Sequence, residues 1–358
     1  MAENSKRKLK WNFNLFSSDL GVDLGTANVL IYAENKGVVV REPSVVAVDK
    51  NTGKILQVGA DARNMLGRTP GNVVAMHPLK DGVISDHEMT VKMLQILFRR
   101  AVKASIFNPK PRVVICVPSG VTEVEERSVI NAAIEAGARR VYLIEEPLAA
   151  ALGANLPIAG ADGHMVVDIG GGTTDVAVLS LNGVANSSSV EVAGDAFDEA
   201  IARYIRRKYG VVIGQVTAED IKINIGCVYP RPEDIHMTVM GRDSKTGLPR
   251  TLNIFSSEIY EVLRRPARQI ADEVLHVLEE TSPELVGDIA RNGITLTGGG
   301  CQIWGMDLLL SERTDIPCTI ADDPDSCVVY GCGKSLSWIN HMQEGPINLA
   351  RKRIMRRE

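Results

Sequence analysis

The feature that most constrains the fold is an internal repeat of one strand-turn-strand plan. The segment DLGVDLGTANVLIY, around Asp23, and the segment MVVDIGGGTTDVAVLSL, around Asp168, each contain an apolar strand, an aspartate, a turn of small residues and a second apolar strand. This plan is typical of a β-hairpin with a glycine-containing turn. Two such hairpins predict a duplicated fold, in which the copies face each other across a cleft if a pseudo-twofold axis relates them.

Short apolar runs alternate with helical patterns along much of the chain. Four nearly continuous apolar runs, each bounded by Gly or Pro, span residues 113–117, 141–144, 165–169 and 294–297. Such runs are typical of strands that are buried on both faces. The segment TEVEERSVINAAIEAGARR, between the first two runs, has helical spacing and a stop at Gly137. The alternation predicts α/β layering around a largely parallel sheet.

Two further helices are expected in the second half of the chain. One covers residues 198–210, and the other lies in SSEIYEVLRRPARQIADEVLHVLEET. Pro266 is expected to kink or interrupt the second of these helices, because a proline inside a helix removes a backbone hydrogen bond and crowds the preceding turn.

Length and charge narrow the class of protein. A chain of 358 residues suits two packed lobes. The 40 Lys and Arg against 44 Asp and Glu give a net charge of -4, so no overall basic field is available to hold nucleic acid. The six cysteines lack the paired spacing of a zinc site, and reduced thiols in a cytosol are expected. No apolar run approaches the roughly 18 residues that cross a bilayer.

The turns of the two hairpins are predicted to hold phosphate, because the backbone amides of small residues can approach an anion closely. The first turn and its flank comprise Gly25, Thr26, Ala27 and Asn28. The second offers three residues without a β-carbon and then two hydroxyl groups, in Gly170, Gly171, Gly172, Thr173 and Thr174. For either hairpin alone, a purely structural turn stays open as an alternative. The duplication favours phosphate binding.

An aspartate ends the first strand of each hairpin. Asp23 and Asp168 are predicted to hold Mg²⁺, through its waters, because Mg²⁺ bridges a few carboxylates and substrate phosphates rather than filling a protein cage. The alternative is that each aspartate only caps a tight turn.

A third glycine-rich stretch, ITLTGGGCQIWGM, follows a strand and precedes an expected helix. The free amides at that helix start suit the sugar or α-phosphate of a nucleotide, and the residues are Gly298, Gly299 and Gly300. A structural strand-to-helix turn is the alternative. Neither this stretch nor GCGKS at 331–335 has the spacing of a P-loop, so P-loop chemistry is excluded.

Together, DLGTAN, DIGGGTTD and LTGGG resemble the two phosphate motifs and the adenosine motif of the superfamily of actin, sugar kinases and heat-shock chaperone ATPases. Within it, EPSVVAV, MLGRTPG, VPSGVTEVEERSV, EAGARRVYLIEEPLAAALGANLPI, TAEDIKINIG and DDPDSCVVYGCGK look like the MreB family over nearly the whole chain. The resemblance implies an actin-like, duplicated ribonuclease-H-like α/β fold with two lobes of two subdomains each around a nucleotide cleft. It also implies ATP and Mg²⁺ as ligands.

The resemblance implies a division of the chain as well. The expected parts are a basic and aromatic extension at 1–18, a first lobe at 19–150 with a small insert at about 41–80, a second lobe at 151–330 with an insert at about 190–252, and a C-terminal helix returning to the first lobe with a basic tail at 331–358.

Further roles follow from the resemblance. Glu125 aligns with the family glutamate that orients the attacking water, and Asp168 and Thr173 are expected to act with it in catalysis. The local sequence favours a different role, because Thr122 and Glu125 form a T-x-x-E capping box at a helix start. One side chain pointing in one direction cannot fill both roles.

Glu219 and Lys222, three apart on one expected helix face, match the family residues that flank the adenosine. From the residues alone they would be an ordinary surface ion pair. This chain has Asn224 and Cys227 where the family usually has Glu and Ser, which leaves only the detail of the adenine pocket open.

The family function is that of an ATP-hydrolysing actin homologue whose filaments organise cell-wall synthesis and maintain rod shape. Its expected partners are further copies of itself, the lipid of the inner membrane face and membrane proteins of wall synthesis; its expected location is cytoplasmic and peripheral to the membrane. Membrane contact is predicted where apolar side chains lie among cations, at Trp11, Phe13, Phe16, Ile106 and Phe107. A small-molecule kinase or a chaperone-type ATPase of the same superfamily is the alternative.

Overall fold

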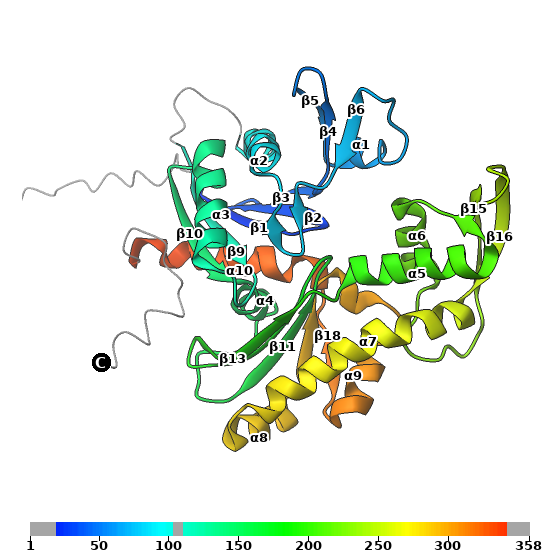
Figure 1. The fold of residues 1–358 in the computed structure, drawn as a ribbon. Coiled ribbons are helices and arrows are strands. Elements are labelled where there is room, and N and C mark those ends of the chain that lie inside the picture. Colours follow the sequence, from blue (N-terminus) through cyan, green and yellow to red (C-terminus); the bar gives the residue numbers. More distant parts are fainter. Residues whose placement is uncertain (1–18, 103–109, 342–358) are drawn as a thin grey trace, which may run out of the picture.

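The computed structural model describes residues 19–102 and 110–341, which are organised around two five-stranded mixed sheets (Figure 1). The first sheet has the order β10-β9-β1-β2-β3. Its strands are β1 (Leu20–Leu24), β2 (Asn28–Ala33), β3 (Gly37–Pro43), β9 (Arg112–Val117) and β10 (Arg140–Glu145). β1, β2 and β3 pair antiparallel, whereas β1, β9 and β10 pair parallel.

The second sheet repeats this topology, with the order β13-β12-β11-β17-β18. Its strands are β11 (His164–Ile169), β12 (Thr174–Ser180), β13 (Gly183–Val190), β17 (Ile294–Thr297) and β18 (Cys318–Ile320). Here too, the first three strands form an antiparallel meander and the last two add in parallel. The duplication predicted from the two hairpins is therefore confirmed for the complete sheets.

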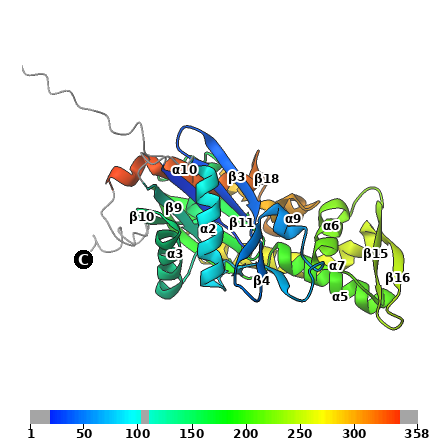
Figure 2. The ribbon, with the colours of Figure 1, turned by 90° about the horizontal axis from the view of Figure 1, so that it is seen from above.

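Helices and sheets alternate in layers. The outer face of the first sheet packs against α2 (His87–Ala101) and α3 (Glu123–Ala136), and the outer face of the second against α7 (Ser256–Glu279), α8 (Pro283–Asn292) and α9 (Met306–Thr314). Between the sheets lie α4 (Glu146–Gly153) and α10 (Cys327–Ser335). Figure 2 shows α2, α3 and α10 around the first sheet from above. Because both faces of each sheet are covered, the central strands β1, β9 and β11 are buried and apolar along most of their length, whereas the edge strand β13 is largely polar.

The central helices α4 and α10 approach each other so closely that glycine is required at the contact. A β-carbon added to Gly153 would lie 1.7 Å from the carbonyl oxygen of Cys327, and one added to Gly331 would lie 1.8 Å from that of Ala149. Each helix follows the last strand of its own sheet. The two halves are thus joined by an equivalent pair of helices.

Each half carries an insert after its third strand. The first insert contains β4 (Val46–Asp49), β5 (Ile55–Val58), α1 (Ala60–Arg63) and β6 (Val73–Met76), followed by β7 (Leu79–Lys80) and β8 (Val83–Ile84). The second contains α5 (Gly194–Tyr209), β14 (Val211–Val212), α6 (Gln215–Ile225), β15 (His236–Asp243) and β16 (Pro249–Phe255). In Figure 1 the two inserts project from the same side of the layered body, so that α1 and α6 face each other.

The structure corrects one expectation about the helices. α7 runs unbroken from Ser256 to Glu279, so the predicted interruption at Pro266 is wrong. Pro266 is itself buried, and the apolar face of α7 packs against the second sheet along much of its length. That tertiary packing offsets the backbone hydrogen bond that proline removes. None of the helices in the described ranges is both long and apolar enough to cross a membrane.

Candidate functional site

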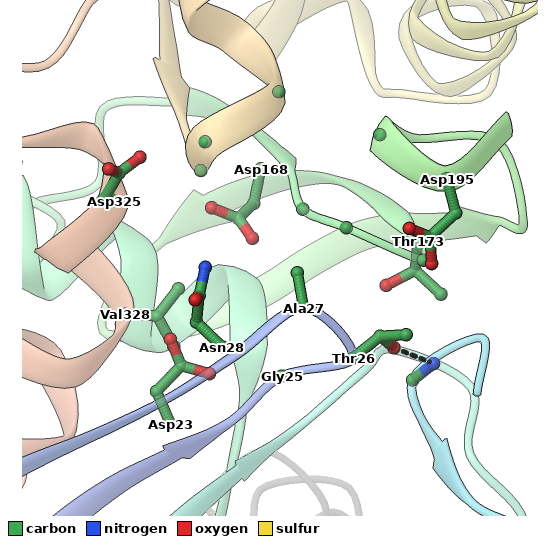
Figure 3. A pocket seen from close by; sticks show the side chains of 18 of the residues that line it. Asp23, Gly25, Thr26, Ala27, Asn28, Asp168, Thr173, Asp195, Asp325 and Val328 are labelled. Carbon is green, nitrogen blue, oxygen red and sulfur yellow. Dashed lines mark hydrogen bonds between the residues drawn. The ribbon is translucent and has the colours of Figure 1, made fainter. Parts of the chain in front are cut away.

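A cavity of about 510 Å³ lies where the two hairpin turns meet (Figure 3). All three predicted glycine-rich segments line it, although they come from distant parts of the chain. The predicted site residues in the lining are Asp23, Gly25, Thr26, Ala27, Asn28, Asp168, Gly170, Gly171, Gly172, Thr173, Glu219, Lys222, Gly298, Gly299 and Gly300. Figure 3 shows Asp23 and Asn28 entering from the first hairpin, opposite Asp168 of the second.

The two hairpin turns touch each other at the floor of this cavity. A β-carbon on Gly171 would lie 2.6 Å from the β-carbon of Ala27, and one on Gly172 would lie 2.7 Å from Thr26 Oγ1. The Thr26 hydroxyl oxygen also accepts a hydrogen bond from the backbone N–H of Gly82 at 2.9 Å (Figure 3). The glycines of the second turn are therefore needed for this contact with the first.

The two predicted metal ligands are buried carboxylates. Burial, followed by the charge of Asp168, raises the pKa of Asp23 to about 7. Burial also raises the pKa of Asp168 to about 6, although the hydroxyl of Thr297 donates a hydrogen bond to Asp168 Oδ1 at 2.5 Å and lowers the pKa. Near neutral pH, both groups are thus poised to gain from a nearby cation.

Glu146, Asp195 and Asp325 also line the cavity and were not predicted, and Glu146 is the one that lies close to Asp23. The Cys116 thiol donates to Asp23 Oδ1 at 3.5 Å and lies 3.9 Å from Glu146 Oε1. One donor atom from each of Asp23, Cys116 and Glu146 falls within 4.8 Å of the others. Burial, followed by the charge of Asp175, raises the pKa of Glu146 well above its usual value. Its position directly after β10 is the signal that sequence reasoning could have used.

Glu125, in contrast, lies outside the lining of the cavity. Its Oε2 accepts hydrogen bonds from the backbone N–H and the hydroxyl of Thr122, both at 2.8 Å, while Glu125 N donates to Thr122 Oγ1 at 3.3 Å. This is a complete capping box at the start of α3. Water positioning therefore finds no support in the geometry of Glu125.

Thr174 is also absent from the lining. Its side chain is buried, and its hydroxyl donates a hydrogen bond to the carbonyl oxygen of Val192 at 2.7 Å. Thr173 is thus the hydroxyl of this pair that the cavity contacts. The five residues predicted for membrane contact lie outside the described ranges.

Glu219 and Lys222 line the cavity but do not pair with each other. Glu219 Oε2 lies 2.5 Å from Arg63 Nη2, so a salt bridge connects α6 of the second insert to α1 of the first. Lys222 Nζ lies 2.8 Å from Asp198 Oδ2 and donates to the carbonyl oxygen of Gly194 at 3.1 Å. The simple surface pair between Glu219 and Lys222 is therefore not formed.

The third glycine segment differs in one respect from the prediction. Gly298 directly follows β17 and has a φ of 80°, and an added β-carbon there would lie 2.3 Å from the carbonyl oxygen of Ile169. A short 3₁₀ helix, η2 (Gly299–Gln302), follows, and α9 begins only at Met306. The glycine amides therefore belong to a 3₁₀ turn and not to the start of an α-helix.

Acidic side chains outnumber basic ones around the cavity. The basic residues in its lining are Arg41 and Lys222, and the acidic residues are Asp23, Glu146, Asp168, Asp195, Glu219 and Asp325. Arg41 is held by Ser326 and lies 3.7 Å from Asp325. An anionic ligand would therefore depend on backbone amides and on a cation that arrives with it.

Two copies of one mixed sheet, joined so that a glycine-containing turn from each meets over one cavity, define an actin-like fold. The chain belongs to the MreB/Mbl family, because the family described as MreB/Mbl protein matches residues 17–344. It is 51% identical over 330 residues to the cell shape-determining protein MreB of Escherichia coli (strain K12), covering 91% of this chain and 95% of that protein.

Other relatives agree with this placement. The chain is 48% identical over 322 residues to the cell shape-determining protein Mbl of Bacillus subtilis (strain 168), covering 90% of this chain and 96% of that one. The crystal structure of MreB5 of Spiroplasma citri bound to AMPPNP superposes with a TM-score of 0.85 at 40% identity, over 91% of this chain and 97% of that one. The MamK double helical filament, with a TM-score of 0.75 at 22% identity, shares the fold; the match covers 89% of this chain and 98% of that one.

Proposed function

We propose that the chain binds Mg·ATP in this cavity, hydrolyses it and assembles into filaments at the inner face of the cell membrane. The observation that carries this proposal is the contact of two equivalent hairpin turns, one from each half, over one cavity. Further support comes from the structures of MreB5 of Spiroplasma citri, a 40–41% identical relative bound to AMPPNP or to ADP. The family link to cell shape supports a role in organising wall synthesis in rod-shaped cells.

In this proposal, each glycine segment binds one part of the nucleotide. The backbone amides of the turns at 25–27 and 170–173 hold the phosphates from opposite sides. The amides at 298–300 contact the sugar or α-phosphate, while Glu219 and Lys222 flank the adenosine. The boundaries at 19–150 and 151–330, with their inserts, are proposed as the two lobes that the nucleotide joins.

The donor chemistry of Asp23 and Asp168 fits Mg²⁺. The two residues offer hard carboxylate oxygens, which Mg²⁺ prefers over the thiol of Cys116. Their pKa values of about 7 and about 6, raised first by burial and for Asp23 also by the charge of Asp168, indicate that a cation would relieve unfavourable charge. When bound, Mg²⁺ would neutralise charge on the phosphates.

We further propose that Glu146, rather than Glu125, orients the attacking water. Glu146 lines the cavity, whereas the Glu125 carboxylate is used by the cap of α3. Glu146→Gln should lower ATP turnover about 100-fold with little change in nucleotide affinity. Glu125→Gln should leave turnover intact and lower the free energy of unfolding by about 1 kcal/mol at most. The opposite pattern would restore the role to Glu125.

Membrane binding is proposed from the sequence of two segments, 6–16 and 105–112, which combine cations with apolar side chains. A chain with Ile106→Ser, Phe107→Ser and the first 16 residues removed should lose co-sedimentation with anionic liposomes. Undiminished sedimentation rejects this part of the proposal.

Electron microscopy of the purified protein separates the candidate functions. Filaments that form with Mg·ATP support the actin-like polymer. Single particles that phosphorylate an added small molecule would indicate a kinase, and single particles whose ATPase rate responds to unfolded peptide would indicate a chaperone-type ATPase.

A further inference from the structure

Two buried oxygen atoms directly behind the cavity have no hydrogen-bond partner among the described residues. They are Ser119 Oγ, in the segment after β9, and Asp175 Oδ2, near the start of β12. The other carboxylate oxygen, Asp175 Oδ1, accepts a hydrogen bond from the Ser119 backbone N–H at 2.8 Å. Since Ser119 belongs to the first half and Asp175 to the second, both orphaned atoms lie at the junction of the halves.

Such atoms are costly unless something binds them. A buried polar group without a partner loses its hydration and gains no hydrogen bond in exchange. The Asp175 side chain is fully enclosed, with 1% of its surface exposed, and Ser119 has 9% exposed. Burial raises the pKa of the Asp175 carboxyl to about 7, whereas the nearby hydroxyls of Ser189 and Thr173 lower it. Several polar groups converging on one buried place are the usual setting of an ordered water.

The chain segments that carry Ser119 and Asp175 both reach the cavity. Pro118 and Thr173 line the cavity, one residue before Ser119 and two before Asp175. A β-carbon on Gly82 would lie 2.8 Å from Pro118 Cγ and 3.2 Å from Thr173 Cγ2, so these two side chains flank the same glycine. In the sheet, Asp175 pairs with Asp168. Ser119 and Asp175 therefore lie close in the chain to two residues, Pro118 and Thr173, that line the cavity.

We propose that Ser119 and Asp175 hold an ordered water behind Thr173, and that this water fixes the direction of the Thr173 hydroxyl during ATP hydrolysis. A threonine hydroxyl can rotate between several hydrogen-bond partners, and a fixed partner behind it restricts that choice. Ser119 and Asp175 are positioning residues, because they act through the water and through Thr173. The inference rests on the proposed ATP hydrolysis.

Ser119→Ala tests the proposal most cleanly, because it removes only the orphaned hydroxyl. Turnover at saturating Mg·ATP should fall about tenfold, whereas the Kd for AMPPNP should stay within about twofold of the wild-type value. A purely structural hydroxyl predicts the reverse: its removal eliminates an unsatisfied buried group, so the melting temperature rises or holds and turnover is unchanged. Wild-type turnover in Ser119→Ala overturns the proposal.

Asp175→Asn provides a second test, with an expected loss of turnover at least as large as that of Ser119→Ala. If this variant does not fold, the Ser119→Ala result decides alone. The matched control is Ser335→Ala, whose buried hydroxyl donates to the carbonyl oxygen of Cys332 at 2.7 Å in α10. This control should retain wild-type turnover.

A crystal structure of the AMPPNP complex gives an independent readout. A water within about 3 Å of both Ser119 Oγ and Asp175 Oδ2 is expected in the wild type and not in Ser119→Ala. A dry, closed contact between the two side chains overturns the proposal. A wild-type protein that binds AMPPNP but never hydrolyses ATP rejects the proposed hydrolysis and this inference together. Hydrolysis that is insensitive to Ser119 and Asp175 rejects only the inference.

Discussion

The two hairpins share a backbone plan but divide the side chains unequally. In the first, the turn carries Thr26 and Ala27; in the second, the facing positions are Gly171 and Gly172. Because the turns meet at the floor of the cavity, only one of them can carry β-carbons at the contact. Duplication thus accounts for the fold, while the meeting of the two copies accounts for their differences in sequence.

Asp23 and Asp168 also occupy equivalent positions in the two hairpins but face different side chains. Each faces a side chain from the neighbouring parallel strand: the Cys116 thiol of β9 for Asp23, and the Thr297 hydroxyl of β17 for Asp168. A hydroxyl is a stronger donor than a thiol. Burial raises the pKa of both carboxyls; the charge of Asp168 raises that of Asp23 further, and the Thr297 hydrogen bond lowers that of Asp168. Equivalent positions therefore have different hydrogen-bond donors.

The largest effect is expected when the glycine contact is blocked. Gly171→Ala places a β-carbon 2.6 Å from Ala27 Cβ and should weaken AMPPNP binding about 100-fold, equivalent to about 2.7 kcal/mol. Ala27→Gly in the same chain should restore part of the affinity, because it removes the clashing atom. Gly71→Ala, where an added β-carbon meets nothing within 4 Å, is the control. Absence of rescue would show that the loss does not arise from contact between the turns.

The buried carboxylates should make the nucleotide-free protein less stable as pH rises. The folded-state pKa of Asp23 is raised, so its contribution to stability is complete below the unfolded value near 3.8 and is lost as pH rises through about 7. Asp23→Asn should therefore stabilise the nucleotide-free protein at pH 8, by about 2 kcal/mol after relaxation of the site, and have little effect at pH 4. Denaturant unfolding at the two pH values measures this difference. Equal effects of Asp23→Asn at pH 4 and pH 8 would show that ionisation of Asp23 does not destabilise the folded protein.

Exchange of the donors should reduce the difference between the aspartates. Thr297→Val removes the hydrogen bond to Asp168 and should raise the pKa of that carboxyl further. Binding of Mg·AMPPNP at pH 6.5 should then weaken about tenfold, with recovery at pH 8.5. Cys116→Thr is the complementary change and should shift the pH dependence toward lower pH. A loss that does not depend on pH would indicate a packing defect at Thr297.

The smallest effect is expected at the Arg63–Glu219 salt bridge, which connects α1 of the first insert to α6 of the second. Both side chains are about 30% exposed, so solvent and salt weaken the pair. Arg63→Ala should speed release of a fluorescent ADP analogue about threefold at low salt and less at high salt. The exposed pair Arg127–Glu123 on α3 offers a control in Arg127→Ala. A change as large as the one expected for Gly171→Ala would mean that this salt bridge controls nucleotide binding as strongly as the contact between the hairpin turns.

Much of the fold could be predicted because its signals are local and repeated. The hairpins, the buried strands and the meeting of the glycine segments follow from short patterns and their duplication. Glu146 was not predicted because Glu145, Glu146 and Pro147, at the end of a strand, are also typical of an ordinary helix start. Arg63 and Glu219 lie 156 residues apart, and no local pattern pairs them.

Glu125 and Pro266 show where local patterns succeed and where they fail. For Glu125, the capping box favoured by the local sequence is formed, so the family alignment and the local sequence indicate different roles for one side chain. For Pro266, the local rule predicts a kink or an interruption, and the interruption is absent because packing of α7 against the second sheet keeps the helix continuous. The role of Glu125 thus follows from the local sequence, whereas the continuity of α7 at Pro266 depends on packing partners that are distant in the sequence.

The central claim is that both hairpins bind the same nucleotide and its metal. Calorimetry of Mg·AMPPNP binding tests it most directly, with the wild type, Asp23→Ala, Asp168→Ala and the double variant. If both carboxylates act on one bound metal, each single change should weaken binding strongly, and the double change should cost much less than the sum of the two. Unaltered affinity in either single variant, or losses that simply add, would mean that the hairpins do not hold one ligand together.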